Sequence, residues 1–430
     1  MKVVIVGGGF AGLKLARELN NKQDIEVLLL NKVNYHQFQP LFYQVATAGL
    51  DASNISFPLR KVFQKSKNVT VRLADVKEIL SSENKVTTDV GDFSYDYLVL
   101  ATGADTNFFG NKQLQEACYP MKSTMQALQI RNKLIQNFED ALVVADKPKE
   151  LEATLSIIVV GGGATGVEVS GALSEMKKYV LPKDYPSLNA TAMKIYLLEG
   201  SPKTLGAMSE KSSAESRSYL EKLGVIVRTG TVVKEFDGNK VTLGTGETIE
   251  THTVIWAAGI KGNVLPGISQ DLLVRGNRIK VDRQNRIQGF ENVYAIGDVS
   301  YMETPKYPHG HPQLANVAIN QAKTLAENFT RMLNGNKHYQ VEFEYHDKGS
   351  MATVGKHKAV VDLPKPKIHL GGLIAWLIWM FLHLMLILGV KNKLQIFINW
   401  MYKYFTSDQS LRLIFTDFYR PVKRRDENEL

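Results

Sequence analysis

A glycine-rich turn close to the start of the chain constrains the fold more than any other feature of the sequence. Residues 3–6 are apolar and β-branched, as in a strand buried on both faces of a parallel sheet. Gly7, Gly9 and Gly12 follow with the spacing G-x-G-x-x-G, and a helix is predicted over 10–20. The first glycine permits a tight turn, the second lets backbone approach a pyrophosphate, and the third lets helix and strand pack closely. The pattern predicts that dinucleotide phosphates meet the N-terminus of this helix.

The same pattern recurs later in the chain. An apolar run over 155–160 leads into Gly161, Gly163 and Gly166, again in the order strand, glycine turn and helix. A single motif of this kind is weak evidence because glycine turns are common, and either copy could be an ordinary βα turn. Two copies with the expected flanking residues predict two dinucleotide sites in one chain.

The elements around the two motifs also repeat. A strand, a glycine helix, a second strand, a β meander and a strand with small terminal residues occur in each half, and those last strands end at Gly103 and Gly259. This duplication predicts an α/β fold with two Rossmann-like domains, the second inserted in the first. We expect one domain over 1–112 and 262–335, the other over 113–261, and a C-terminal β segment with membrane-associating helices over 336–430.

Residues at the ends of the second strands are candidates for ribose recognition. The strand 25–30 leads to Asn31, which can form hydrogen bonds but lacks the charge of the acid usually found there. Lys32 could reach a phosphate or remain a solvated lysine. The strand 194–199 ends in Glu199, whose carboxylate would bind both ribose hydroxyls of NADH and repel the 2′-phosphate of NADPH. A solvated glutamate is the alternative.

Three further stretches carry candidate site residues. Residues 34–49 have neither helical nor strand periodicity, and this aromatic loop could place backbone near a flat ring or be a packed surface loop. Gly297 and Asp298 end a short strand, where the carboxylate could hold ribityl or ribose hydroxyls. A helix is predicted over 312–333, and Asn316 and Asn320 share one face of it. These amides could line an acceptor pocket or be surface residues.

Glu168 lies two residues after Gly166, in the first turns of the second glycine helix. The positive end of the helix dipole favours a carboxylate there, so a raised pKa is not expected. Glu168 could be a catalytic acid or a simple helix-start acid.

The C-terminal region suggests contact with lipid. Residues 371–390 are twenty in number with His383 as the one ionisable side chain, which reaches the length of a membrane span. A second segment, rich in aromatic and basic residues, continues to Phe405. One span, a monotopic hairpin and a buried core helix are the three alternatives. From Lys365 onward ten Lys or Arg oppose five Asp or Glu, and a basic tail opposes translocation, so we expect monotopic attachment to anionic lipid through Gly371 to Phe405.

Composition narrows the function classes. The 430 residues have 44% apolar and 22% charged residues, values typical of a globular protein of two or three domains. Cys118 is the single cysteine, so an internal disulfide and dithiol chemistry are excluded. No signal peptide and no metal site are predicted. The net charge of +9 allows nucleic acid as a partner, but the apolar C-terminal context favours lipid instead.

Taken together, these motifs resemble the type II (single-subunit) NADH:quinone oxidoreductases over essentially the full length. The resemblance implies non-covalent FAD on the first glycine motif, NADH on the second, a membrane quinone as acceptor, attachment to the cytoplasmic face of the cell membrane, and compatibility with a homodimer. Glu168 matches the family's acid near the nicotinamide and quinone sites. The family pattern Ala-Gln-x-x-x-Gln is replaced here by Ala315-Asn316-Val317-Ala318-Ile319-Asn320, whose two amide side chains are each one methylene shorter.

The predicted cofactor-contacting residues form one set. For FAD they are Gly7, Gly9, Phe10, Ala11, Gly12, Asn31, Lys32, Thr47, Val76, Ala101, Thr102, Gly103, Gly297, Asp298, Ala315 and Asn316. For NADH they are Gly161, Gly163, Ala164, Thr165, Gly166, Glu199, Ala258 and Gly259.

The predicted function is a respiratory NADH dehydrogenase that passes a hydride from NADH to FAD and two electrons to quinone without pumping protons. Glu168, Asn316 and Asn320 are its candidate catalytic residues. A flavoprotein reductase that serves a carrier protein is the main alternative, and a non-enzymatic NADH-sensing or nucleic-acid-binding flavoprotein is a further one.

Overall fold

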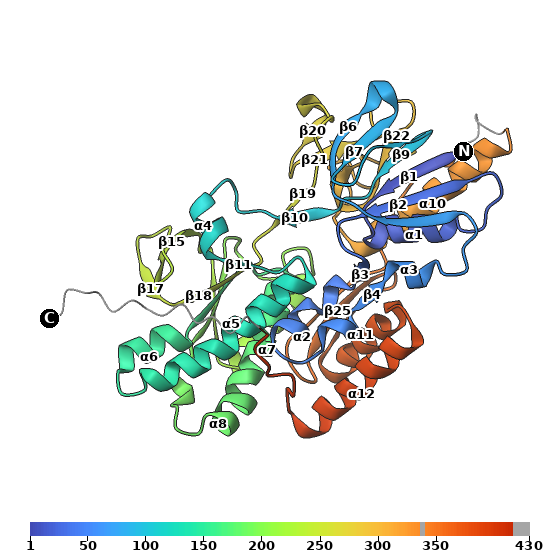
Figure 1. Ribbon diagram of the computed structural model, residues 1–430. Coiled ribbons are helices and arrows are strands. Elements are labelled where there is room, and N and C mark those ends of the chain that lie inside the picture. The colour runs from blue at the N-terminus through green and yellow to red at the C-terminus, as the bar shows by residue number, and fades with distance from the viewer. Residues whose placement is uncertain (336–339, 416–430) are drawn as a thin grey trace.

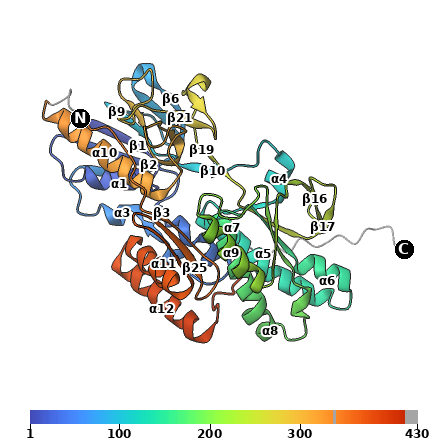
Figure 2. The ribbon, with the colours of Figure 1, turned by 180° about the vertical axis from the view of Figure 1, so that it is seen from behind.

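The structure is a computed structural model and describes residues 1–335 and 340–415. Two α/β lobes lie side by side, and a pair of helices from the C-terminal region packs beneath them (Figure 1). Seen from behind, the same helix pair lies against strand β25 and near helix α7 (Figure 2). The basic residues after position 415, which contribute to the predicted contact with anionic lipid, lie outside the described residues.

The first lobe is built on a parallel five-stranded sheet with the order β22-β9-β1-β2-β5. Strand β1 (Lys2–Val6) pairs with β2 (Glu26–Asn31) and β9 (Tyr97–Leu100), and β2 also pairs with β5 (Val69–Leu73). Strand β22 (Val293–Ala295) joins this sheet only after the chain has built the second lobe. The second unit is therefore inserted in the first. Helices α1 (Phe10–Glu18) and α10 (Ala315–Leu333) pack together on one face, and α10 begins three residues later than predicted.

The second lobe repeats this plan with the strand order β11-β18-β12-β13-β14. Its strands are β11 (Tyr119–Pro120), β12 (Ile157–Val160), β13 (Ile195–Glu199), β14 (Val225–Thr229) and β18 (Thr253–Trp256). The sequence predicts a meander over 225–229, 232–236 and 240–243. The first of these ranges is wrong, because β14 pairs in parallel with β13 as the edge of this sheet. The meander itself consists of β15 (Val233–Phe236), β16 (Lys240–Leu243) and β17 (Thr248–Glu250).

Two antiparallel strands connect the lobes. Strand β10 (Ala104–Thr106) leaves the first lobe, and β19 (Ile260–Gly262) returns beside it. Both strands lie next to the domain boundaries expected from the sequence. The remaining strands of the first lobe are β3 (Tyr35–Gln37), β4 (Ser56–Pro58), β6 (Val76–Leu80), β7 (Lys85–Thr88), β8 (Phe93–Ser94), β20 (Leu273–Val274), β21 (Arg278–Lys280) and β23 (Ser300–Tyr301).

Helices of the inserted lobe cover its sheet. They are α4 (Lys112–Ala117), α5 (Thr124–Val143), α6 (Pro148–Leu155), α7 (Ala164–Glu175), α8 (Leu181–Asp184) and α9 (Glu210–Lys222). Helix α5 agrees closely with the helix that the sequence predicts over 124–144, and the Ser123 side chain caps it by accepting from the N–H of Gln126.

The segment 34–49 is not the irregular surface loop that its lack of periodicity suggested. It contains strand β3, a 3₁₀ turn (Gln39–Leu41) and helix α2 (Phe42–Ala46), and helix α3 (Leu59–Val62) follows. Every residue of α2 is buried, and the helix packs between α5 and α7. A helix of five residues is too short to display a period, so packing determines its conformation.

The C-terminal region forms an antiparallel sheet and a helical hairpin. The sheet consists of β24 (Ser350–Thr353), β25 (Ala359–Pro364) and β26 (Lys367–Gly371), and the hairpin of α11 (Gly372–Leu386) and α12 (Val390–Thr406). Trp379, Ile396 and Trp400 are buried in a core that extends to helices α2, α5 and α7. Among the described residues, no helix combines the length and apolar character needed to cross a bilayer.

Candidate functional site: two glycine cradles and a buried carboxyl group

The two glycine turns have the same internal geometry. Gly7 and Gly161 have φ of +108° and +110°, and a Cβ on either would collide with backbone, at Ala101 and Ala257 respectively. A Cβ on Gly12 would collide with the carbonyl of Gly7. A Cβ on Gly166 would likewise collide with the carbonyl of Gly161. The first and third glycines are therefore required for the turn and for helix packing.

The middle glycine of each turn differs from its neighbours. No atom lies within 4 Å of a Cβ built on Gly9 or on Gly163. The space beside each backbone is open at the N-terminus of a helix, α1 or α7. This is the cradle that a pyrophosphate group requires, so both turns fit a dinucleotide.

The residue at the end of the second strand supports the turn in each lobe. Asn31 Oδ1 accepts the N–H of Gly8 at 2.8 Å, and Asn31 Nδ2 donates to the carbonyl of Val33 at 2.7 Å. In the inserted lobe Glu199 accepts the N–H of Gly162 and, at 2.6 Å, that of Ser201. Asn31 thus replaces the usual acid with a neutral hydrogen bond, while Glu199 brings a negative charge to the edge of the second cradle. Lys32 forms an ion pair with Asp75 at 2.9 Å.

Asp298 lies where the first sheet meets helix α10. It belongs to a 3₁₀ turn (Gly297–Val299) whose first N–H donates to Gln321 Oε1 at 2.8 Å. Burial raises the pKa of Asp298, and the nearby cations Lys122 and Arg278 oppose this shift. Its position at the carboxyl end of β22 agrees with a group that holds polyol hydroxyls in the first cradle.

Other predicted cofactor residues come from several different elements. Thr102 donates its hydroxyl to the carbonyl of Asn263 at 2.6 Å, and Thr47 donates to that of Tyr43 at 2.8 Å. Ala315 is the first residue of α10, and Val76 is buried at the start of β6. The remaining predicted residues lie in the glycine turns or at the ends of β9 and β18; they are Phe10, Ala11, Ala101, Gly103, Ala164, Thr165, Ala258 and Gly259.

Glu168 contradicts the prediction of an ordinary pKa. Its side chain is 7% exposed on helix α7, and burial raises its pKa to about 8. The N–H of Thr353, which donates to Oε1 at 3.3 Å, and the Trp379 indole lower the pKa only in part. The loss of hydration outweighs the helix dipole, because the dipole acts mainly on the first turn. Glu168 is therefore mostly protonated at neutral pH.

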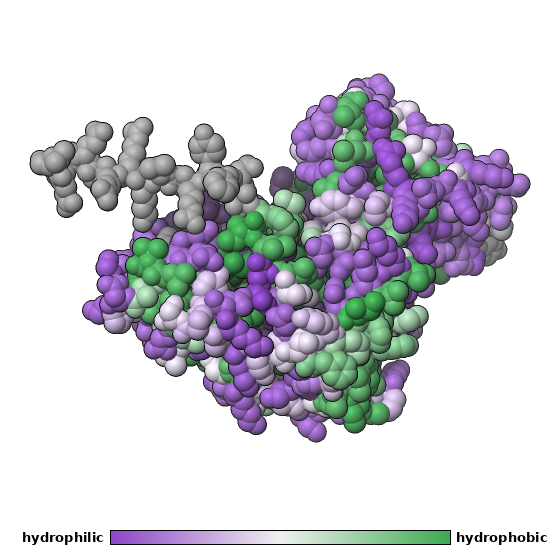
Figure 3. Space-filling model, turned by 60° about the horizontal axis from the view of Figure 1, so that its bottom comes forward, coloured by the Kyte–Doolittle hydropathy of each residue, from purple (hydrophilic) through white to green (hydrophobic). Residues whose placement is uncertain are grey.

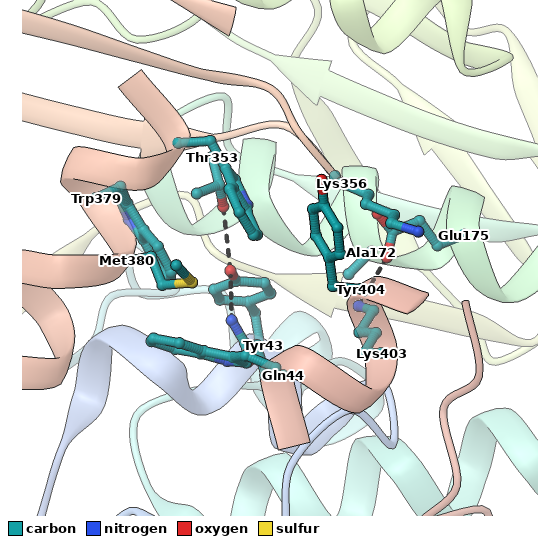
Figure 4. Close-up of a pocket in the computed structure, with 13 residues that line it drawn as sticks. Tyr43, Gln44, Ala172, Glu175, Thr353, Lys356, Trp379, Met380, Lys403 and Tyr404 are labelled. Atoms are coloured by element: carbon teal, nitrogen blue, oxygen red, sulfur yellow. Dashed lines mark hydrogen bonds and ion pairs between the residues drawn. The ribbon is translucent and has the colours of Figure 1, made fainter. Parts of the chain in front are cut away.

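A hydrogen-bonded chain of side chains lies beside Glu168. The Tyr43 hydroxyl lies 3.1 Å from Thr353 Oγ1, and Gln44 Nε2 donates to the same hydroxyl at 2.9 Å. Trp400 Nε1 donates to Gln44 Oε1 at 2.8 Å. Figure 4 shows Tyr43 between Thr353 and Gln44, with Trp379 close by. Helices α2 and α12 and strand β24 thus meet at the buried carboxyl group.

A cavity of about 50 Å³ lies between α7 and the hairpin. Its lining includes Tyr43, Gln44, Thr353, Trp379 and Trp400. At roughly 10–15 Å³ per water, this volume has room for a few water molecules and not for a whole aromatic ring. Its far end holds Glu175, 5% exposed, in an ion pair with Lys403 at 2.7 Å (Figure 4). The other lining residues are Ala172, Gly355, Lys356, Trp376, Met380 and Tyr404.

Asn316 and Asn320, the two amides predicted for the acceptor pocket, do not line this cavity. Asn320 donates its side-chain amide to the carbonyl of Asn316 at 2.7 Å, one turn back along α10. Asn320 also lines a polar hollow with Glu327, Glu342 and Lys348. The structure therefore brings Glu168 together with Tyr43 and Trp379, but not with Asn320.

The sequence interpretation missed Tyr43, Gln44, Thr353 and Trp400. Tyr43 and Gln44 fall in the segment that was predicted as a loop, and Thr353 lies in a strand that no motif marked. Trp379 and Trp400 were assigned to the lipid-facing aromatics. The sequence does contain a signal of a buried helix face. One face of α11 carries residues at intervals of four, namely Ala375, Trp379 and His383.

Two dinucleotide cradles on linked Rossmann-like units, with a buried acid at the second, define the class of flavoprotein reductases that use a pyridine nucleotide. Residues 1–322 match the family described as pyridine nucleotide-disulphide oxidoreductase. Residues 347–408 match the NDH2 C-terminal domain.

Curated relatives narrow this class. The chain is 34% identical over 433 residues to the type II NADH:quinone oxidoreductase Ndh of Mycobacterium tuberculosis, with 97% of this chain and 90% of the relative covered. It is 30% identical over 371 residues to the Staphylococcus aureus type II NADH:quinone oxidoreductase, with coverage of 84% and 89%. The chain belongs to the type II NADH:quinone oxidoreductases, and its activity is the non-proton-pumping reduction of quinone by NADH.

Solved structures share the fold. NDH2 from Plasmodium falciparum, solved in complex with NADH, superimposes with a TM-score of 0.87 at 20% identity, covering 95% of this chain and 99% of the other. The sulfide:quinone oxidoreductase of Aquifex aeolicus gives 0.68 at 20% identity, with 97% and 93% covered.

Proposed function

We propose that the first cradle holds non-covalent FAD and the second holds NADH, so that electrons pass from NADH to a membrane quinone. The observation that carries this assignment is the pair of open middle glycines, Gly9 and Gly163, each at a helix N-terminus. FAD, when bound, supplies the hydride acceptor and two-electron donor that the reaction needs. Asn31 and Asp298 border the first cradle, and Glu199 borders the second.

The buried acid fits a role in handling protons. The overall reaction consumes NADH, one proton and a quinone, and it yields NAD⁺ and a quinol. Glu168 is protonated at neutral pH and can therefore give a proton to the acceptor side and recover it from water. Glu199 favours NADH over NADPH because its carboxylate would repel a 2′-phosphate.

We place the protein on the cytoplasmic face of the membrane, held by the hairpin of α11 and α12. Apolar side chains that project from both helices support this, among them Ile374 and Phe381, which are 64% and 62% exposed. Hydrophobic residues gather on the surface at the hairpin end of the molecule (Figure 3). Lys391 and Lys393 at the start of α12 suit anionic headgroups.

The test is purification of the full chain from membranes, release and identification of the flavin, and assay of NADH oxidation with and without a short-chain quinone. We expect FAD and quinone-dependent turnover. A colourless protein would contradict the cofactor assignment, and turnover only with an added carrier protein would favour the alternative reductase. Sedimentation of the same preparation tests whether the protein forms a homodimer.

A further inference from the structure

Three helices and a strand are joined by a hydrogen-bonded chain that starts in the C-terminal hairpin. Trp400 on α12 donates to Gln44 on α2 at 2.8 Å, Gln44 donates to Tyr43 at 2.9 Å, and Tyr43 lies 3.1 Å from Thr353 Oγ1 on β24. The backbone N–H of Thr353 donates to Glu168 on α7 at 3.3 Å. All five residues are buried.

The donors and acceptors of this chain can be assigned from its first member. An indole N–H can only donate, so Gln44 Oε1 accepts from Trp400 and the orientation of the Gln44 amide is fixed. The Gln44 NH₂ then donates to the Tyr43 oxygen. Thr353 Oγ1 is the other partner of the phenol among the described residues, and a buried O–H is costly to leave unpaired, so Tyr43 donates to Thr353.

Thr353 is consequently held by two bonds from different elements. Its hydroxyl oxygen is held by Tyr43, and its N–H faces the Glu168 carboxyl group. Movement of β24 at this residue would loosen the packing that excludes water from Glu168.

We infer that Trp400 is a positioning residue for Glu168, which it holds in a buried site through Gln44, Tyr43 and Thr353, so that the hairpin sets the pH range in which the acid works. This inference rests on the proposed role of Glu168 in proton handling. The hairpin then completes the reaction site as well as forming the apolar surface.

Other titratable groups lie around Glu168, and the substitution of Trp400 replaces none of them. They are Tyr43 on α2, Glu175 on α7, Lys356 after β24, His383 on α11 and Lys403 on α12. The His383 ring stacks on Trp379 with centroids 4.1 Å apart, and burial lowers its pKa to about 4, so it is neutral in the relevant range. A change in pH profile would therefore report on the chain itself.

The decisive variant is Trp400→Phe in the full-length holoenzyme. It keeps an aromatic ring in the core and removes one N–H. Trp376→Phe is the matched control, because Trp376 lines the same cavity but does not take part in the chain. The measurement is quinone reduction at saturating NADH across pH 6–10, together with flavin content.

Wild-type activity is expected to fall as pH rises through the pKa of Glu168. This falling part of the pH profile is its alkaline limb. Trp400→Phe should move this limb to lower pH by about half a unit to one unit, with unchanged flavin content, because water that reaches Glu168 stabilises the carboxylate. Weakening of the long bond from the Thr353 N–H acts in the opposite direction and is the smaller effect. Trp376→Phe should leave the limb in place. Should Trp400→Phe fail to fold, Tyr43→Phe breaks the same chain at its next link and should give the same shift.

A limb that stays at the wild-type pH in a folded Trp400→Phe or Tyr43→Phe variant would overturn the inference. Glu168→Gln separates this outcome from failure of the proposed function. If Glu168→Gln abolishes the limb while the chain variants leave it in place, Glu168 retains its role and only the inference fails. If Glu168→Gln keeps the limb, the proton-handling role itself is wrong.

Discussion

The backbone N–H of Thr353 donates a long hydrogen bond of 3.3 Å to the carboxyl group of Glu168, across 185 residues of sequence. A carboxylate that accepts two or three good hydrogen bonds can keep a low pKa, but here the Thr353 N–H and the Trp379 indole do not offset the loss of hydration. Glu168 therefore remains a neutral acid up to a pH of about 8. The contact also shows that the acid of the inserted lobe is completed by the C-terminal sheet.

The raised pKa of Glu168 predicts a pH-dependent loss of stability. The unfolded chain releases this proton near the ordinary glutamate pKa of about 4.3, whereas the folded chain keeps it to about 8. Between those values the folded state binds one more proton, so stability falls as pH rises and levels off above pH 8. Glu168→Gln should remove this decline, so that its melting temperature gains on the wild type from pH 5 to pH 8. Thermal unfolding at several pH values measures this.

Glu221→Gln is a suitable control, because Glu221 is half-exposed and pairs with Arg217 on the same helix. Its melting temperature should follow that of the wild type at every pH. Parallel curves for wild type and Glu168→Gln would show that Glu168 is ionised in the folded protein at neutral pH.

The open middle glycines predict two variants, each of which weakens the binding of a different dinucleotide. Gly9→Ala and Gly163→Ala should both fold, because a Cβ meets no protein atom at either position. Gly9→Ala should weaken FAD binding at least about tenfold, since its methyl group occupies the approach of the pyrophosphate. Gly163→Ala should keep FAD and raise the KM for NADH by a similar factor. Flavin titration of the apoprotein and steady-state kinetics measure the two effects.

Each of these variants serves as the control for the other. Gly12→Ala gives a further contrast, because its Cβ would collide with the carbonyl of Gly7 and should prevent folding of the first lobe. If Gly9→Ala impaired NADH binding and spared flavin, the assignment of the two cradles would be reversed.

Much of the fold could be predicted because both cradles are local in sequence. A strand, a glycine turn and a helix lie within about twenty residues, and their spacing carries the steric requirements that Gly7 and Gly12 meet in the structure. The strand-end residues Asn31 and Glu199 could be found by the same logic. The roles of both in bracing the turn through Gly8 and Gly162 could not, because side-chain direction depends on the folded turn.

The buried site was harder to predict because its parts come from distant segments. Trp400 reads as a lipid-facing aromatic in an apolar segment, but its indole reaches Gln44 across 356 residues. Helix α2 is too short to show a period, and burial of Glu168 depends on contact with Thr353 and Trp379. Local rules for helix termini placed the pKa of Glu168 incorrectly, because desolvation by these distant residues is the larger effect.

The negative charge of Glu199 predicts that the protein prefers NADH to NADPH. Its carboxylate accepts two backbone N–H groups at the edge of the second cradle, which fixes its position. Glu199→Gln keeps an oxygen for Gly162 but removes the charge, so the ratio of kcat/KM for NADPH to that for NADH should rise by about tenfold or more. Glu247→Gln, which removes an exposed carboxylate paired with Arg228, should leave the ratio unchanged. An unchanged ratio in Glu199→Gln would place nucleotide selection elsewhere.

The exposed apolar side chains of the hairpin predict that the hairpin binds the protein to lipid. Because other hairpin side chains are part of the core, a test of lipid binding must change exposed side chains alone. Removing the chain from Gly371 onward would also remove Trp379, Ile396 and Trp400 from the core, so loss of binding could reflect misfolding. Ile374→Ser with Phe381→Ser changes two exposed side chains and leaves that core intact. The double variant should keep its flavin and bind liposomes of mixed anionic and neutral lipid at least about tenfold more weakly, because two apolar side chains no longer enter the bilayer. Val143→Ser is the matched control, since Val143 is 80% exposed on α5 away from the hairpin. Equal co-sedimentation of the double variant and the control would mean that another surface holds the protein to lipid.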